Sequence, residues 1–224
     1  MKAYSLLLLS LLASDAAVAG RPMLIDDAGL TDAHTCQLET WLQSSSKNRE
    51  RWFLPACNPY GNFEVAAGVA EFQTDGAAVV RSLALQGKTL LRRLDPGDWG
   101  IGLAFGTVRP EHGRGGSDYA YVPLSVSRWH DSLVAHFNLG WSRDRALDAD
   151  RTTWGAGAEY AVANRVTVFA EILGDNATRP TTHGGFSFAL IPGRMKLDLS
   201  FGRNMALGNG GNFCAAGIDI YFPP

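Results

Sequence analysis

The chain has 224 residues, of which 46% are hydrophobic and 19% are charged, and its formal net charge is −2. This balance excludes both the basic surface that nucleic acid requires and an acidic tail, so we expect no nucleic-acid partner. The 25 glycines against four methionines favour a β-rich chain with many tight turns.

Residues 1–19 have the organisation of a cleaved signal peptide. A positively charged start precedes an apolar stretch over residues 6–12, and Ala17-Val18-Ala19 has the small-x-small pattern that a signal peptidase cleaves. An N-terminal membrane anchor is the alternative, but the stretch is too short to span a bilayer and Asp15 follows it. We therefore predict export, cleavage at this point, and one mature domain over residues 20–224.

Beyond the signal peptide the chain has no run of about 18 apolar residues, the length that a membrane helix needs. It shows instead the alternation of a β-strand, in which successive side chains point to opposite faces. Over residues 195–201, one face carries Met, Leu, Leu and Phe, and the other carries Lys, Asp and Ser. The same separation recurs over residues 63–70, 99–106, 133–141, 153–160, 166–172 and 218–222.

The composition of the two faces indicates a transmembrane barrel rather than a soluble sandwich. The polar faces alternate charges with glycine, alanine and serine, as expected where side chains converge inside a narrow barrel. The exposed face of a soluble sandwich is usually dense in Lys, Glu and Thr instead. Lys or Arg facing lipid near the bilayer centre costs roughly 2–4 kcal/mol, which would enforce the separation. The predicted fold class is all-β, an antiparallel transmembrane β-barrel.

Turn residues divide the mature chain into about twelve strands. We expect these strands near residues 35–44, 49–57, 62–72, 78–90, 98–107, 118–128, 132–142, 152–162, 165–174, 184–191, 194–202 and 213–222. Ten strands is the alternative, because Pro55 interrupts the second strand and Arg81 lies on the apolar side of the fourth.

The lengths of the connections predict the orientation of the barrel. From the fourth strand onward short turns alternate with long polar connections, as in bacterial outer-membrane barrels, whose short turns lie in the periplasm. The long connections are predicted over residues 108–117, 142–151, 174–183 and 203–212. This alternation places both the N-terminus and the C-terminus of the barrel in the periplasm.

The last predicted strand carries alternating Ile218, Ile220 and Phe222. This pattern is similar to the C-terminal signal that presents outer-membrane proteins for insertion, although such signals usually end on the aromatic residue and Pro223-Pro224 follow it here. We therefore expect the barrel-assembly machinery and outer-membrane lipid to be partners of the chain.

Three cysteines remain in the mature chain. Cys36 and Cys57 fall at the periplasmic ends of neighbouring predicted strands, so we predict a disulfide between them in the oxidising periplasm. Cys214 starts the last strand at the opposite end and is expected to be free. No CxxC or HxxxH spacing supports zinc, and we predict neither a metal nor another cofactor.

The polar faces supply the candidate lumen-lining residues. These residues are Glu64, Lys88, His136, Asn138, Glu159, Glu171, Lys196, Asp198 and Asp219. The acids could shape an interior that prefers cations, or the two lysines and Glu39 could close them into a salt-bridged plug. A barrel of this strand number leaves little open width, which favours pairing.

His136 allows one catalytic interpretation. A barrel hydrolase acting on lipid would need a serine nucleophile beside this base. Ser142 lies on the same face, but roughly 20 Å along the strand, which is too far for contact. A hydrogen-bonded interior histidine is therefore favoured, and we predict no catalytic residues.

Four short segments carry a family resemblance. They are Arg21–Ala28, Cys36–Glu39, Pro55–Asn58 and His136–Trp141. Together they resemble the outer-membrane proteins assigned to the MetA pathway of phenol degradation. The resemblance implies an outer-membrane barrel for the passage of small, hydrophobic or aromatic compounds, and it implies no catalytic residues.

We therefore predict a porin-like channel or transporter in the outer membrane of a Gram-negative bacterium, with an unidentified small-molecule solute. An outer-membrane barrel enzyme acting on lipid or lipopolysaccharide is one alternative, and a structural or adhesive barrel is another. Residues 20–33 form an N-terminal segment that lies either in the periplasm or in the lumen.

Overall fold

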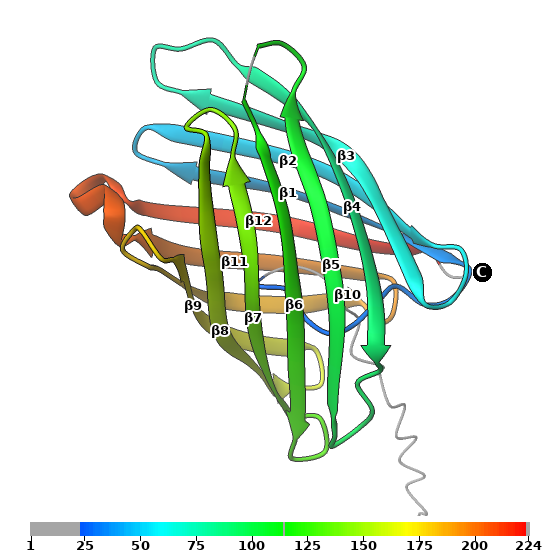
Figure 1. Cartoon of the computed structure of the whole chain (residues 1–224). Helices are drawn as coiled ribbons and strands as arrows, with labels where there is room; N and C mark the ends of the chain where they lie inside the picture. The colour runs from blue at the N-terminus through cyan, green and yellow to red at the C-terminus, as the bar shows by residue number, and fades with distance from the viewer. Residues whose placement is uncertain (1–22, 114, 223–224) are drawn as a thin grey trace, which may run out of the picture.

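The computed structural model describes residues 23–113 and 115–222, which form a closed antiparallel barrel (Figure 1). Each strand pairs with its neighbours in sequence, and the last strand pairs with the first. The predicted signal peptide lies outside the described residues. No helix in the described part of the chain is long and apolar enough to cross a membrane.

The twelve predicted strands are confirmed. They are β1 (Thr35–Ser45), β2 (Asn48–Asn58), β3 (Phe63–Thr74), β4 (Val80–Arg92), β5 (Trp99–Pro110), β6 (Ser117–Arg128), β7 (Leu133–Asp144), β8 (Ala149–Ala163), β9 (Val166–Asp175), β10 (Thr181–Ile191), β11 (Met195–Asn204) and β12 (Asn212–Phe222). A short 3₁₀ helix, η1 (Met205–Gly210), connects β11 to β12.

The ten-strand alternative is wrong for two local reasons. β2 keeps its register with β1 through Pro55, which pairs with Leu38. Arg81 does face outward, but it is the second residue of β4, where its guanidinium lies 3.0 Å from the carboxylate of Glu71. A charge at the end of a strand costs far less than one at the bilayer centre. Neither residue therefore ends a strand.

The alternation of side chains places polar groups inside and apolar groups outside. In β11, Leu199 and Phe201 are exposed on the outer surface, whereas Asp198 and Ser200 are buried on the inner one. The interior also contains many small residues; for example, Ala104 in β5 has no exposed surface. The barrel therefore has an apolar exterior and a polar interior, the reverse of a soluble protein.

The connections predicted to be long are shorter than expected, because the strands extend into their polar flanks. β7 and β8 stay paired as far as Asp144 and Ala149, so their connection is reduced to residues 145–148. The Asp144 carboxylate accepts hydrogen bonds from the Ala146 and Leu147 amides and so stabilises this tight turn. The polar side chains that predicted a long loop therefore belong to the ends of paired strands.

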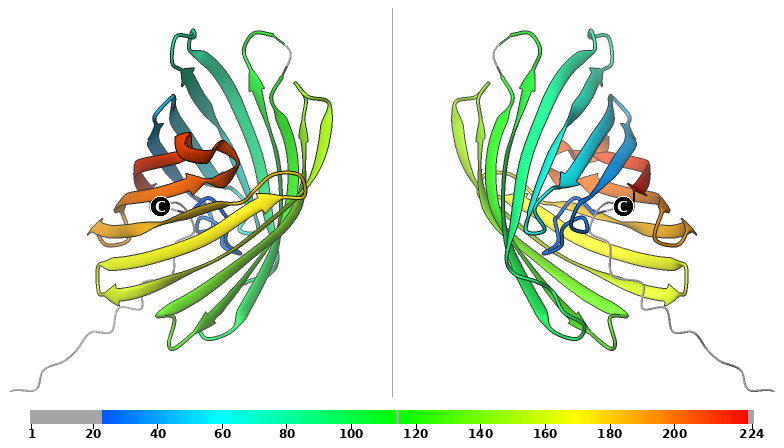
Figure 2. Two further views of the ribbon diagram at one scale, coloured as in Figure 1. Left: turned by 90° about the vertical axis from the view of Figure 1, so that its left-hand side faces the viewer. Right: turned by 90° about the vertical axis from the view of Figure 1, so that its right-hand side faces the viewer.

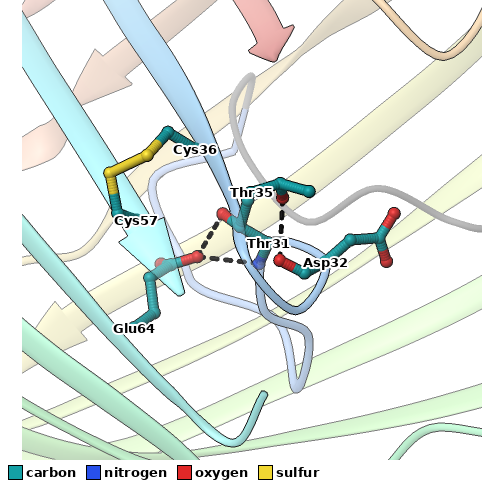
Figure 3. The surroundings of a disulfide bond; sticks show 6 residues. All are labelled: Thr31, Asp32, Thr35, Cys36, Cys57 and Glu64. Atoms are coloured by element: carbon teal, nitrogen blue, oxygen red, sulfur yellow. Dashed lines mark hydrogen bonds between the residues drawn. A yellow bond between two sulfur atoms is a disulfide. The ribbon is translucent and has the colours of Figure 1, made fainter. Parts of the chain in front are cut away.

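β1 begins and β12 ends at the same end of the barrel. Cys36, near the start of β1, pairs with Phe222 at the end of β12. Cys36 is also directly opposite Cys57 of β2, and the two form the predicted disulfide (Figure 3). Cys214 is exposed and carries no disulfide.

Residues 23–34, which precede β1, run through the interior of the barrel. Figure 2 shows this segment in dark blue, enclosed by the wall. Its backbone and side chains hydrogen-bond to residues of β2, β3, β4, β6, β7 and β9. The described part of the predicted N-terminal segment therefore lies inside the barrel.

The disulfide closes a loop with a sequence separation of 21 residues. Replacing both Cys36 and Cys57 by serine should destabilise the barrel by about 3 kcal/mol, because the unfolded chain regains the freedom of this loop. Urea unfolding in detergent micelles, followed by loss of the compact electrophoretic form, measures the change. Cys214→Ser is the matched control and should have no effect; an equal loss in that variant would contradict the assignment.

Ala170 lies in the middle of β9 with its side chain exposed on the outer surface. Ala170→Arg should destabilise the barrel in a lipid bilayer by roughly 2–4 kcal/mol, because the guanidinium would lie in hydrocarbon. Ala170→Leu adds volume without charge and should be tolerated. Equal stability of the Arg and Leu variants in liposomes would contradict a lipid-facing position.

Candidate functional site

The N-terminal segment occupies the interior of the barrel. We call residues 23–31 the plug. The Ile25 and Ala28 side chains of the plug are buried against the wall. The wall contributes polar side chains from widely separated strands, and each of them meets a particular group of the plug.

Glu171 of β9 holds the start of the plug. Its two carboxylate oxygens accept the amide hydrogens of Leu24 and Ile25, at 2.7 and 2.9 Å. Nδ1 of His183, on β10, lies 2.6 Å from the same carboxylate. Hydrogen bonds to a charged acceptor contribute about 1.5–3 kcal/mol each, so this residue is a strong anchor.

Asp26 is the central contact of the plug. Its amide donates to Asn138 of β7 and its carbonyl accepts from the same side chain, both at 2.7 Å. Its carboxylate accepts hydrogen bonds from Lys88 of β4 and from the Tyr121 hydroxyl of β6, again at 2.7 Å. The wall therefore recognises both the backbone and the side chain of one plug residue.

Lys88 also binds the next plug residue, with its Nζ 3.0 Å from the Asp27 carboxylate. Burial by itself would raise the pKa of Asp27, but the positive charge of Lys88 holds that pKa below its usual range. The lysine is thus bound between two plug carboxylates and is almost completely buried.

His136 belongs to a hydrogen-bonded chain in the interior of the barrel. Its Nδ1 lies 2.8 Å from Oγ of Ser125 on β6, and its Nε2 lies 3.4 Å from Glu159 of β8. This order of serine, histidine and acid resembles a hydrolase triad. Ser125, however, has no exposed surface, and its hydroxyl accepts the amide hydrogen of Ala28. The plug covers the oxygen that would have to attack a substrate.

The far end of the plug is fixed beside the disulfide (Figure 3). Glu64 of β3 accepts the amide hydrogen of Thr31 at 2.7 Å and also binds its hydroxyl. The Thr31 carbonyl accepts a hydrogen bond from Asn58, which follows Cys57 at the end of β2. The chain then turns into β1, so the plug is tied to the wall at the disulfide-bonded end of the barrel.

Two glycines of β8 make room for apolar side chains of the plug. A Cβ at Gly155 would lie 2.3 Å from Cγ2 of Ile25, and one at Gly157 would lie 2.7 Å from Cε of Met23. The inward glycines that alternate along this strand therefore provide space for the plug.

Lys196 completes the pairing of interior charges on the other side of the barrel. Its Nζ lies 3.1 Å from the Asp219 carboxylate, on the neighbouring strand β12. Asp198, two residues along β11, is buried on the same inner face. Glu39 of β1 pairs in register with Asp219, so these acids lie together on the inner wall.

Two cavities flank the plug. The outer cavity, of about 300 Å³, lies at the η1 end of the barrel, and Trp41, Trp52, Phe213 and Glu50 contribute to its lining. The rings of Trp41 and Trp52 stack with centroids 5.0 Å apart. The inner cavity, of about 230 Å³, lies between the plug and β1–β4. Trp41 and Leu24 line both cavities.

Every candidate lumen-lining residue predicted from the sequence is on the inner face. Five of them bind the plug directly or through one hydrogen bond, namely Glu64, Lys88, His136, Asn138 and Glu171. Sequence reasoning missed Tyr121, Ser125, Asn58 and His183. The alternation of β6 could have identified Tyr121 and Ser125, but nothing in the sequence indicated that the plug would be their partner.

The chain was compared with known protein families, curated proteins and solved structures. A model of the family described as "Uncharacterised conserved protein UCP029691" matches residues 7–222. No curated protein matches the chain.

Solved structures resemble the chain at low sequence identity. The KdgM porin in complex with disordered oligogalacturonate has a TM-score of 0.69 and 10% identity, with 84% of this chain and 99% of that chain covered. The NanC porin has a TM-score of 0.61 and 11% identity, with 83% and 98% covered. The COG4313 outer membrane channel from Pseudomonas putida F1 has a TM-score of 0.60 and 9% identity, with 88% and 98% covered. At these identities the likeness establishes a porin-like barrel fold.

The contact between Gly155 and Ile25 makes the position of the plug testable. Gly155→Ala should displace Ile25, since overpacking costs about 1–3 kcal/mol. Hydrogen exchange of the Leu24, Ile25 and Asp26 amides should then accelerate roughly 5–150-fold. Adding Ile25→Ala should restore slow exchange because it removes the clashing methyl group.

The matched control for that experiment is Gly115→Ala, where a Cβ would have no neighbour closer than 3.9 Å. This variant should exchange like the unmodified protein. Fast exchange that persists in the Gly155→Ala, Ile25→Ala double variant would contradict the packing of Ile25 against β8.

Proposed function

The chain belongs to the family described as uncharacterised conserved protein UCP029691, and we propose that it is an outer-membrane channel for small solutes, closed by its own N-terminal plug. The observation that carries this proposal is a closed barrel with an apolar exterior and a polar interior that holds a short plug between two cavities. The porin-like fold supports it.

The exterior supports residence in a membrane. Large apolar side chains are exposed around the whole barrel, including Leu139 at 64% and Phe201 at 67%. Such an apolar surface on a soluble monomer would cause association. In the proposed orientation, the start of β1 and the end of β12 face the periplasm. The signal peptide directs export, and the last strand presents the chain for insertion into the outer membrane.

The outer cavity favours small aromatic or hydrophobic solutes. Its lining includes the stacked Trp41 and Trp52 rings and Phe213, and aromatic rings prefer offset-stacked or edge-to-face partners. The described residues that line it include Glu50 but no Lys, Arg or His. It therefore offers no countercharge to a polyanion such as the oligogalacturonate named for the KdgM complex. The resemblance of Arg21–Ala28 to the MetA-pathway proteins supports the same class of solute.

The plug must move before a solute can pass through the barrel. A solute that enters the outer cavity meets Leu24 and the residues anchored to Glu171 and Asn138. Passage requires these hydrogen bonds to open, and water or the solute must replace them. The closed state should therefore conduct poorly, and loosening the plug should increase conductance.

Deleting residues 23–31 should raise the single-channel conductance in planar bilayers at least severalfold, because the deletion joins the two cavities. Phenol added on the η1 side should reduce the current, and Trp41→Ala should weaken this block. Heat-modifiable electrophoretic migration shows whether each variant is folded.

Leu147→Ser, on the exposed connection between β7 and β8, is the matched control, and its conductance should equal that of the unmodified protein. A folded deletion variant that conducts no better than the intact chain would refute a plugged channel. If Trp41→Ala leaves the block by phenol unchanged, the aromatic site is refuted, but the proposed channel is not.

A further inference from the structure

The inner faces of β1 and β2 bring two cross-strand pairs to the outer cavity. Trp41 pairs in register with Trp52, and Gln43 pairs with Glu50. All four residues line the cavity. Residues two apart on one face of a strand are separated by about 7 Å. An aromatic ring that lies against the tryptophans can therefore place a polar substituent beside Gln43.

The side-chain amide of Gln43 is open to a ligand. Gln43 is half-buried and lines the cavity, and neither its carbonyl oxygen nor its amino group hydrogen-bonds to another described residue. The other two amides of the described lining are engaged through their carbonyl oxygens. Oδ1 of Asn48 accepts a hydrogen bond from Thr74 at 2.9 Å, and Oδ1 of Asn204 accepts one from the Ala206 amide at 3.0 Å. Gln43 therefore offers a donor and an acceptor in one plane, and another amide is their complement.

The surroundings of Gln43 favour a neutral aromatic partner. Phe213 of β12 pairs in register with Ser45 and also lines the cavity, so aromatic side chains lie on two sides of Gln43. The Glu50 carboxylate, opposite Gln43, lies 3.4 Å from Nε1 of Trp52. The described lining has no Lys, Arg or His to compensate an anionic ligand. An aromatic carboxylate would therefore meet a charge of its own sign beside the amide.

We propose that the outer cavity binds neutral planar aromatic carboxamides and lactams, with the ring against the Trp41–Trp52 pair and the amide edge on Gln43. Conjugation keeps the carbonyl and N–H groups of such a compound in the plane of its ring, so stacking and both hydrogen bonds form together. Ligand pockets begin at roughly 300 Å³, and the cavity of about 300 Å³ suits a compound with one ring. The proposal rests on the proposed function, because it names the class of solute that the outer cavity of that channel admits.

Four small probes that differ in one feature each test the site. Benzamide has the ring and the amide, cyclohexanecarboxamide lacks the aromatic ring, acetophenone lacks the N–H group, and benzoate carries a negative charge. Ligand-observed NMR titration of the purified mature chain in detergent micelles gives the four affinities, and micelles without protein correct for partitioning. Benzamide should bind about fivefold more tightly than acetophenone, the difference of about one hydrogen bond. It should also bind severalfold more tightly than the other two probes.

Gln43→Leu keeps the bulk of the side chain and removes the amide. The ratio of the benzamide affinity to the acetophenone affinity should then fall to about one, since neither compound can pair with leucine. Gln73→Leu is the matched control, because it makes the same change at an exposed position of β3, and it should keep the ratio of the unmodified chain. Trp52→Leu should instead weaken benzamide and acetophenone alike and remove the preference for benzamide over cyclohexanecarboxamide.

Equal affinities of the unmodified chain for benzamide and acetophenone would overturn the proposal, and so would an unchanged ratio in folded Gln43→Leu. If that variant does not fold, a preference for benzamide over cyclohexanecarboxamide that persists in Trp52→Leu overturns it. Selective binding of benzamide by a chain that does not conduct in planar bilayers would refute the channel but not this site. Conductance by a chain that does not select benzamide would refute this site but not the channel.

Discussion

The rest of the structure depends on the closure of the sheet upon itself. In lipid no water is available to unpaired backbone groups, so a membrane-spanning sheet must pair every strand on both sides. Pairing of Cys36 with Phe222 brings the first and last strands together and removes both edges. Closure then gives each side chain only two environments, the surrounding lipid or the interior. Every charge carried by the middle of a strand must face inward.

The crowding of inward charges explains the plug. Lys88 and Glu171 are buried on the inner face, where an unpaired charge would be costly. The plug supplies what the wall lacks: carboxylates for Lys88 and backbone amides for Glu171. The wall in turn supplies the hydrogen-bond partners of a segment without regular structure. The barrel and its N-terminal segment therefore complete each other's polar contacts.

The sequence predicted the wall well because a period of two residues is a local property. Whether Asp198 or Phe201 points inward or outward follows from the residues beside it in sequence. The pairing of Cys36 with Cys57 follows from the short turn that joins their two strands. The ends of the strands were less predictable. Asp144, for example, is paired in β7, and its carboxylate also accepts a hydrogen bond within the turn that follows. The partners of the inward residues were not predictable. Asn138 binds Asp26 across 112 residues of sequence, and no local sequence pattern indicates a contact between residues so far apart.

The balance of charge inside the barrel also determines what can open it. On the wall, Glu171, Glu64 and Ser125 accept amide hydrogens of the plug. Lys88, Tyr121 and Asn58 donate hydrogen bonds to it. Displacing the plug leaves these acceptors without donors unless water or a solute replaces them, and a neutral aromatic compound brings few donors. In the channel that we propose, displacement of the plug therefore depends on groups that replace both the donors and the acceptors of these hydrogen bonds.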